Sequence, residues 1–481
     1  MDFTSSVYLA FVTATVLAFN AWREPRFRQW VLLLANLVFL ASFVRSFEQL
    51  VPLAGFLGLG YAATRWVARW PKRWVLGLSI ALIVAVFVVL KRYTFLPTAI
   101  DLPYLYLQIG LSYILFRILQ MVIDSAGGER LARLDALNFV NFTCNFLCFV
   151  SGPIQRSDEY LAGLGQLSRE VDETLAFTAL HRIIKGFIKL AVVSAVANYL
   201  FAHFSAAVLA ETTSLVGWRY AVQYAASAVT YTFYLYYNFS GYMDIVIGIG
   251  WFLGQNLPEN FNRPFAARNI FEFWSRWHMT LSEWFKTYLF NPLMAFLAAR
   301  LSAPMLLPYL GVIAFFVTFF VMGVWHGSTG VFVIYGLVMG AGASLNKLWQ
   351  VFMTQRLGKK RYKAVGESVV YASLARGLLF AFFALAVTAL WVNMDQLSLV
   401  ASRLGVGGLV LALFGTALCA AFAGPLLDLA GRMLESSAPR LDRPGVAVVV
   451  TRNLILASEV LLIFGVASFF HKAPEFVYKA F

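Results

Sequence analysis

Charged residues are scarce in this chain of 481 residues, of which only 13% are Asp, Glu, Lys or Arg. A soluble globular chain carries about 25% charged residues. Hydrophobic residues instead make up 60% of the sequence, and they recur in runs of 15 to 20, such as residues 74–90, 306–324 and 378–392. These runs approach the ~20 residues that a helix needs to cross a bilayer. The composition therefore excludes a string of soluble domains and predicts an all-α polytopic membrane protein.

Cysteine is also rare, and its three positions are Cys144, Cys148 and Cys419. Three cysteines cannot form a disulfide framework. The first two are four positions apart, which would place them on one face of a helix, and small apolar packing is favoured there over a reactive or lipidated thiol. Because the sequence has no HExxH or CxxC motif and no carboxylate cluster, we expect no metal site and no bound cofactor.

Acidic residues are outnumbered, with 24 against 38 basic ones and a net charge of +14. The basic residues lie between apolar runs rather than on a face interleaved with aromatic residues. We therefore expect them to contact the lipid bilayer, and we expect no nucleic-acid partner. The first apolar run begins at Val7 with no basic region before it and no small-residue cleavage site after it. It is therefore interpreted as a membrane span rather than a signal peptide.

The basic loops predict an orientation in the membrane. Residues 1–6 contain no Lys or Arg, whereas residues 22–29 contain three Arg. The positive-inside rule then places the N-terminus outside and this loop in the cytoplasm, together with the basic segments 65–73 and 347–363. With ~20 residues per span, we expect 11 to 14 membrane helices, some of them re-entrant.

The segment 231–292 mixes apolar and polar residues in an unusual way. Polar groups at membrane depth usually face a cavity or one another. The candidates for lining a substrate channel are Asn238, Asp244, Asn260 and Arg276, and the alternative for Asp244 is a buried partner of an Arg. Ser240-Gly241 predicts a break after an aromatic span. Residues 255–267 contain two prolines and predict irregular backbone, which at membrane depth is tolerated only inside protein or beside water.

Two histidines in buried contexts are candidates for chemistry. Residues 269–288 predict one helix with His278 on its apolar face, where a histidine is more often a satisfied core residue, and with Glu272 and Arg276 paired at i,i+4. His326 ends a long apolar run in the sequence GVWHGST. An imidazole, with an ordinary pKa of ~6.5, can take or give a proton near neutral pH. These two residues alone do not name a reaction.

Three ordered motifs carry a family resemblance. The segments NFSGYMDIVIGIG, ENFNRPFAARNIFEFWSRWHMTLSEWFKTYLF and GVWHG resemble bacterial membrane-bound O-acyltransferases, as do LQIGLSYILFRILQMVID and SGPIQR. The resemblance covers about residues 102–347. The motifs are similar both to those of membrane subunits of polysaccharide O-acetyltransferases, such as that for alginate, and to those of the D-alanyl transfer protein of teichoic acid synthesis.

This resemblance implies a ring of tilted helices with a thinned centre and a through-channel. It implies that His326 is the catalytic residue, that His278 is a second polar residue of the channel, and that Trp325 lines the channel beside it. The implied reaction moves an acyl group, with acetyl favoured, from a cytoplasmic thioester (acetyl-CoA or acyl carrier protein) across the bacterial inner membrane to an extracytoplasmic polysaccharide. An extracytoplasmic esterase-like transferase is the implied partner.

Other functions remain open. One alternative is D-alanyl or another acyl group moved to a different envelope polymer. A transporter that uses the buried histidines as a proton relay belongs to another class, and it predicts paired carboxylates and internal symmetry, which the sequence lacks. An inactive scaffold would keep the fold without depending on His326.

The chain ends in FVYKAF, similar to the aromatic C-terminal hexapeptide F-x-Y-x-x-F of acyl-export systems. This resemblance implies that Tyr478 is transiently acylated, and the alternative is an interfacial anchor with a snorkelling Lys479. The motifs divide the chain into four expected segments. These are N-terminal membrane helices (1–101), the catalytic core (102–347), a cytoplasmic basic loop with C-terminal membrane helices (348–470), and an extracytoplasmic tail (471–481).

Overall fold

The computed structural model describes residues 5–97, 102, 104, 106–127, 134–167, 170–301, 303, 305–437, 454, 456–463 and 465–466. Within these residues the regular structure is helical, with one isolated β-bridge between Phe261 and Trp277. The chain packs into two compact units, one containing residues 1–187 and 241–259 and the other residues 188–240 and 260–474. The four segments expected from the motifs stay a prediction.

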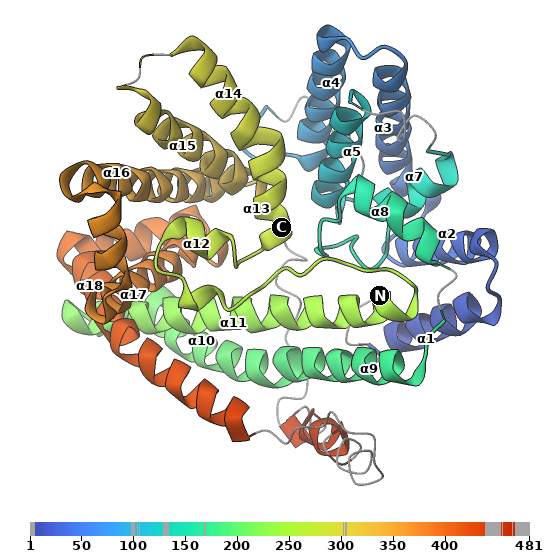
Figure 1. Ribbon diagram of the computed structural model, residues 1–481. Helices are drawn as coiled ribbons and strands as arrows, with labels where there is room; N and C mark the ends of the chain where they lie inside the picture. The colour runs from blue at the N-terminus through green and yellow to red at the C-terminus, as the bar shows by residue number, and fades with distance from the viewer. Residues whose placement is uncertain are drawn as a thin grey trace. The chain divides into compact units, whose positions relative to one another are not determined.

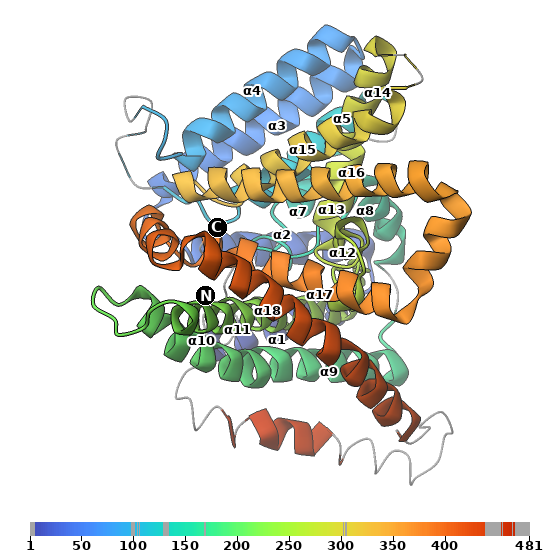
Figure 2. The ribbon, with the colours of Figure 1, turned by 90° about the vertical axis from the view of Figure 1, so that its left-hand side faces the viewer.

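The first unit is built from the N-terminal helices, drawn in blue to teal in Figure 1. They are α1 (Ser6–Ala21), α2 (Pro25–Ala41), η1 (Phe47–Leu50), α3 (Val51–Arg69), α4 (Arg73–Lys91), α5 (Leu111–Ser125), α7 (Ala136–Thr143), α8 (Ser157–Gly163), η3 (Leu164–Gln166) and α9 (Glu173–Phe187). Helix α5 packs against α3 and α4, as Figure 1 shows, and Figure 2 shows α3 and α4 side by side.

The core of this unit is centred on α5, which is buried along almost its whole length. Its Arg117 is 1% exposed and donates hydrogen bonds to the carbonyl oxygens of Thr143 (2.9 Å) and Cys148 (2.7 Å), as a buried charge requires. Cys144 and Cys148 are both buried. Because helix α7 ends at Thr143, before either of them, they do not share a helix face. The expectation of a shared face was wrong, because Arg117 holds the chain here in an irregular path.

The second unit contains most of the long C-terminal helices. They are η4 (Ile188–Val193), α10 (Ser194–Leu209), η5 (Pro264–Ala266), α12 (Ile270–Trp274), α13 (Met279–Phe285), η6 (Lys286–Phe290), α14 (Asn291–Arg300), α15 (Leu307–Trp325), α16 (Gly330–Glu367), α17 (Val369–Ala386), η7 (Val387–Leu390) and α18 (Met394–Ser437). Helices α15 and α16 pack closely, because a Cβ on Gly323 would lie 2.2 Å from the Cα of Gly336. Such small-residue contacts are typical of helices packed in a membrane.

Helix α11 (Trp218–Phe252) runs through Ser240 and Gly241 without interruption, so the expected break was wrong. Other glycines of α9 and α11 serve close packing here. In the first unit, a Cβ on Gly186 would lie 2.7 Å from the carbonyl oxygen of Gly241, and a Cβ on Gly248 would lie 2.7 Å from Ile183. The small residues therefore let α9 approach the end of α11.

Seven helices among the described residues are long and apolar enough to cross a membrane. They cover Phe47–Arg69, Arg73–Lys91, Glu173–Leu209, Leu307–Trp325, Gly330–Glu367, Val369–Leu390 and Met394–Leu426. The prediction of an all-α polytopic membrane protein is confirmed. The number is smaller than the expected 11 to 14, since other apolar helices are shorter, as α1 is, or contain more polar residues.

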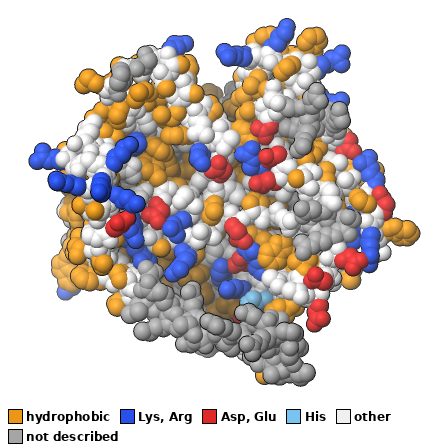
Figure 3. Space-filling view, in the orientation of Figure 1, with side chains coloured by type: hydrophobic (Ala, Val, Ile, Leu, Met, Phe, Trp, Pro, Cys, Tyr) orange, Lys and Arg blue, Asp and Glu red, His pale blue; other side chains and the backbone are white. Residues whose placement is uncertain are grey.

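The basic segment 347–363 is helical rather than a loop. Helix α16 includes it, with a kink at Gly358, where the backbone φ of +75° suits glycine. The expectation of a loop failed because Lys, Arg, Gln and Leu are good helix formers. Lys359, Lys360 and Arg361 are exposed, and Figure 3 shows Lys and Arg side chains gathered over this end of α16.

Candidate active site

His278 lies between two short helices, in a place where one long helix was expected. Helix α12 ends at Trp274 and α13 begins at Met279, so the expectation of a single helix over residues 269–288 was wrong. The backbone pairs instead with residues 260–262. The N–H of Asn262 donates to Arg276 (2.9 Å), and the N–H of Met279 donates to Asn260 (3.0 Å). These bonds take the backbone groups that a continuous helix would have used.

The conformation of His278 is unusual for a non-glycine residue. Its φ is +44° and its ψ is +52°, in the left-handed region. Such residues cost about 1–3 kcal/mol each and cluster at functional sites. The side chain is fully buried, and the ring of Phe239 lies edge-on against it with 4.9 Å between the ring centroids. Its Nδ1 lies 3.3 Å from the Oδ1 of Asn260.

His326 caps the C-terminal end of α15 and is 3% exposed. Its Nδ1 lies 2.6 Å from the carbonyl oxygen of Met322. Because a carbonyl can only accept, Nδ1 carries the hydrogen, and in the neutral ring Nε2 carries the lone pair. The rings of Trp325 and Tyr335 lie edge-on against the imidazole, with centroids 5.0 and 5.7 Å away.

The second unit places the two histidines, which are 48 positions apart in the sequence, close enough for His326 to act electrostatically on His278. Helix α12 and the residues after it are held by three other helices. The N–H of Ile270 donates to Asn346 of α16, Trp274 packs on Phe319 of α15, and Trp277 packs on Phe383 of α17.

His278 lies outside the seven helices that are long enough to span a membrane. Burial lowers the pKa of its imidazole well below the usual range, and the neighbouring His326 lowers that pKa further. Near neutral pH the site therefore holds an uncharged imidazole at position 278.

The other predicted channel residues of this unit have protein partners. The Nδ2 of the fully buried Asn238 lies 3.4 Å from the Oγ of Ser194. Arg276 pairs with Glu272 at 3.0 Å, as the i,i+4 spacing predicted. Whether Asn238, Asn260, Arg276 and Trp325 line a substrate channel stays a prediction. Tyr478 lies outside the described residues.

Asp244 belongs to the first unit, where it lies 3.1 Å from Arg182. Arg182 also makes two contacts of 2.6 Å to the carboxylate of Glu259 and lies over the ring of Trp251, 5.1 Å from its centroid. Asp244 thus has the Arg partner that the sequence offered as the alternative to a channel role. We refer to Arg182, Asp244 and Glu259 as the arginine cluster.

Thr280 is a residue that the sequence reasoning missed. Its backbone N–H and its hydroxyl both donate to Asn260 Oδ1, at 3.0 and 2.9 Å. In the expected helix, positions 278 and 280 would point about 200° apart, so nothing would have connected Thr280 with His278. The signal that could have revealed it is a hydroxyl residue close to a buried histidine.

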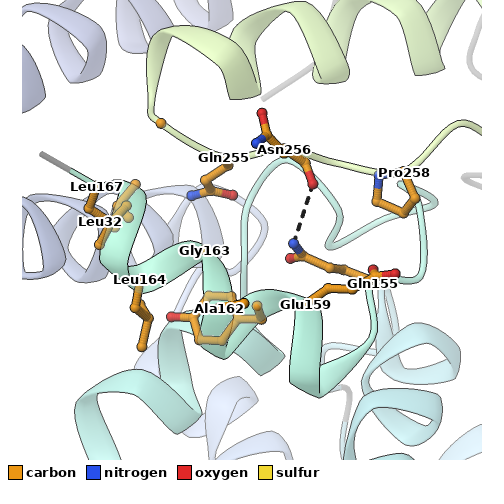
Figure 4. Close-up of a pocket in the computed structure, with 12 residues that line it drawn as sticks. Leu32, Gln155, Glu159, Ala162, Gly163, Leu164, Leu167, Gln255, Asn256 and Pro258 are labelled. Carbon is orange, nitrogen blue, oxygen red and sulfur yellow. Dashed lines mark hydrogen bonds between the residues drawn. The ribbon is translucent and has the colours of Figure 1, made fainter. Parts of the chain in front are cut away.

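The first unit also has a pocket of about 380 Å³, shown in Figure 4. It is lined by Leu32, Gln155, Glu159, Tyr160, Ala162, Gly163, Leu164, Leu167, Gly254, Gln255, Asn256 and Pro258. Across it, Gln155 Nε2 lies 3.5 Å from the carbonyl oxygen of Asn256. Its volume suits a small molecule, and its wall is part apolar and part amide. No group of three His, Cys, Asp or Glu residues in the described part of the chain could hold a metal ion.

Comparisons with known proteins identify the family of the chain. A sequence model of the membrane-bound O-acyltransferase family matches residues 74–386, which include both histidines. The teichoic acid D-alanyltransferase of Bacillus subtilis is 30% identical over 233 residues, 48% of this chain and 56% of that protein. The probable alginate O-acetylase of Pseudomonas aeruginosa is 27% identical over 373 residues, 72% and 66% of the two chains.

The peptidoglycan O-acetyltransferase of Helicobacter pylori is 40% identical over 128 residues, 27% of this chain and 23% of that protein. In each of these three comparisons, the matched region covers less than two thirds of the relative's own length. The family match itself covers well over half of this chain. The resemblance seen in the motifs is confirmed, and this multi-pass membrane protein belongs to the membrane-bound O-acyltransferase family.

Proposed function

We propose that the protein is an O-acyltransferase that moves an acyl group, with acetyl favoured, from a cytoplasmic thioester to hydroxyl groups of an extracytoplasmic polysaccharide. The observation that carries this proposal is the pair of buried histidines, His278 and His326, which distant parts of the family-matched segment bring together. The activities for which the relatives are named support it, since they are an O-acetylase, an O-acetyltransferase and a D-alanyltransferase.

The chemistry follows from the protonation state of His326. A hydroxyl is a poor nucleophile at neutral pH, and a correctly placed base contributes about 10²–10⁴-fold. With Nδ1–H bonded to Met322, the Nε2 of His326 accepts the hydroxyl proton as the oxygen attacks the thioester carbonyl. The tetrahedral intermediate then collapses and expels the thiolate, which takes the proton back from the imidazolium. The base is thereby restored, and the products are an ester and a thiol.

The direction of transfer rests on topology. We expect an inner-membrane protein with its N-terminus outside and with the basic segments 65–73 and 347–363 in the cytoplasm. These segments would attract an anionic donor such as acetyl-CoA or an acyl carrier protein. D-alanyl transfer is the second candidate, favoured by the identity with the D-alanyltransferase. The two candidates are distinguished by offering acetyl and D-alanyl thioesters to the same purified protein and measuring which acyl group it transfers.

In this proposal the C-terminal tail carries the acyl group from the active site to the outside of the membrane. A bulky polymer cannot easily reach a histidine buried among membrane helices, so Tyr478 would accept the acyl group first. Its ordinary pKa of ~10 makes its hydroxyl easier to activate than a sugar hydroxyl. The phenyl ester then passes the acyl group to an extracytoplasmic esterase-like transferase. Tyr478→Phe keeps the ring and removes the hydroxyl, so it should abolish polymer acylation, and a parental level of acylation would leave Tyr478 as an anchor.

The test of the proposed activity is transfer by the full-length protein in liposomes. Radiolabelled acetyl-CoA is added on one side, and alkali-labile label is measured both on the protein itself, which the proposed relay acylates first, and in envelope polysaccharide on the other side. His326→Gln should lower transfer about 10²–10⁴-fold. The matched control is His203→Gln, the same substitution at an exposed position of α10, which should transfer normally. Normal O-acylation of all envelope polysaccharides in cells without the protein would refute the activity.

A further inference from the structure

The orientation of the Asn260 amide is fixed by its neighbour. The backbone N–H of Thr280 lies 3.0 Å from one atom of the amide, and a backbone N–H can only donate. That atom is therefore the oxygen, Oδ1, rather than the nitrogen. The hydroxyl of Thr280 lies 2.9 Å from the same oxygen and adds a second hydrogen bond. Asn260 is fully buried, so water does not compete for this oxygen.

This orientation determines which nitrogen of His278 carries the hydrogen. Nδ1 of the imidazole lies 3.3 Å from Asn260 Oδ1. An unprotonated Nδ1 would point its lone pair at the lone pairs of the oxygen, and the two would repel. A protonated Nδ1 donates to the oxygen, although at 3.3 Å the bond is long for its type. The neutral ring is therefore the Nδ1–H tautomer, with its lone pair on Nε2.

The same asparagine also holds the backbone of His278. The carbonyl oxygen of Asn260 accepts from the N–H of Met279 at 3.0 Å. That bond and the bridge between Phe261 and Trp277 flank the left-handed conformation of His278 on both sides. Side chain and backbone of Asn260 thus fix both the position and the protonation of the ring.

We propose that Asn260 and Thr280 are positioning residues that hold His278 as its Nδ1–H tautomer, so that its Nε2 is a hydrogen-bond acceptor toward the substrate. This inference rests on the proposed function. It gives His278 a specific role, because a neutral ring in this tautomer accepts a hydrogen bond from a donor of the bound substrate other than the attacking hydroxyl, whose single hydrogen goes to His326. The same ring cannot donate a hydrogen bond to the oxyanion of the tetrahedral intermediate. His326 has the same tautomer through Met322, so both rings offer an acceptor nitrogen.

The direct test is ¹⁵N NMR of the full-length protein in lipid, with labelled histidine and no substrate. The chain has 5 histidines, and the signal of position 278 is identified by its loss in His278→Gln. The parental protein should show a protonated Nδ1 and an unprotonated Nε2. Asn260→Ala should give a mixture of tautomers. An Nε2–H tautomer in the parental protein, or an unchanged tautomer in Asn260→Ala, would overturn the proposal.

A second test separates the hydroxyl of Thr280 from its shape. Thr280→Val keeps the branched side chain and loses one donor, so kcat should fall about three- to tenfold, as expected for one hydrogen bond, with little change in KM for the donor. Thr280→Ser restores the hydroxyl and should recover most of the loss. The control is Thr64→Val, which removes a buried hydroxyl bonded to Gly60 within α3 of the first unit. Equal losses in Thr280→Val and Thr64→Val would contradict a positioning role.

Asn260→Asp tests the proposal through the pH dependence of kcat, which a merely structural role of Asn260 would leave unchanged. A carboxylate beside His278 favours the charged imidazolium and raises its pKa, and His326 is a titratable group that acts electrostatically on the same ring. Because the proposed role requires the neutral ring, the acidic limb of the kcat–pH profile should shift to higher pH. A profile that only decreases in height would refute the proposal. Full activity of His278→Gln with the expected tautomer would instead refute the role of His278 in the proposed function.

Discussion

The arginine cluster of the first unit and the two histidines of the second unit hold their polar groups in opposite ways. In the arginine cluster of the first unit, Arg182 and Asp244 form an ion pair, and their side chains are only 16% and 14% exposed. Around His278 and His326 in the second unit, the partners are neutral oxygens and the backbone of His278 is strained. Opposite charges in contact satisfy each other and stabilise a fold, whereas neutral bases held in a strained conformation remain available for chemistry. The comparison predicts that variants of one cluster change stability and variants of the other change catalysis.

The largest expected effect comes from combining the two histidine substitutions. His326→Gln alone should lower kcat about 10²–10⁴-fold, and His278→Gln alone should lower it less, because an orienting acceptor contributes less than the base. If the two rings act in the same step, the double variant should be no worse than His326→Gln, since residues that act as a unit are not additive. Thermal unfolding of all three should stay close to that of the parental protein. Multiplied losses in the double variant would mean that the rings act independently.

The sequence could predict those features of this site that depend on neighbouring residues in the chain. It could not predict the features that depend on contacts between distant residues. Apolar runs form helices wherever they occur, because length and hydropathy act locally, and most expected spans are indeed helical. The pattern over residues 269–288 fits a helix equally well by spacing. Backbone pairing with residues 260–262 overrides it, and that pairing depends on a chain reversal that no local pattern encodes.

The same limit applies to the partners of the histidines. The family motifs identified His278 and His326, and the arrangement of the second unit brings them together. The hydrogen bonds of Asn260 could not be inferred, since they follow from the reversal between α11 and α12. Met322 could have been found, because the fourth residue before the end of a helix presents its carbonyl oxygen to the capping residue.

Arg182→Gln tests the other side of the comparison. It leaves Asp244, which is 14% exposed, without its charged partner, and this should destabilise the protein by about 1–3 kcal/mol, less than for a fully buried pair because Glu259 is 56% exposed. Thermal unfolding measures the change, and kcat of the protein that remains folded should vary less than twofold. The control is Arg23→Gln, which breaks an ion pair with Glu170 whose side chains are 72% and 61% exposed. Such a pair contributes about 0–1 kcal/mol. A loss of kcat at full stability would place Arg182 in the active site.

The smallest expected effect concerns the exposed basic end of α16. Lys359→Gln with Lys360→Gln removes two charges that would attract an anionic donor, so KM for acetyl-CoA should rise about two- to threefold at low salt. The difference should disappear at high salt, where surface charges are screened. Lys286→Gln removes an exposed charge that is already paired with Glu283, and it should leave KM unchanged.

The same lysines test the orientation on which donor access depends. A cysteine introduced at position 359 should react with a membrane-impermeant maleimide only after the cells are opened. Labelling in intact cells would place this end of α16 outside. It would then overturn the predicted topology together with the route of the donor, while the comparison between the two clusters would still hold.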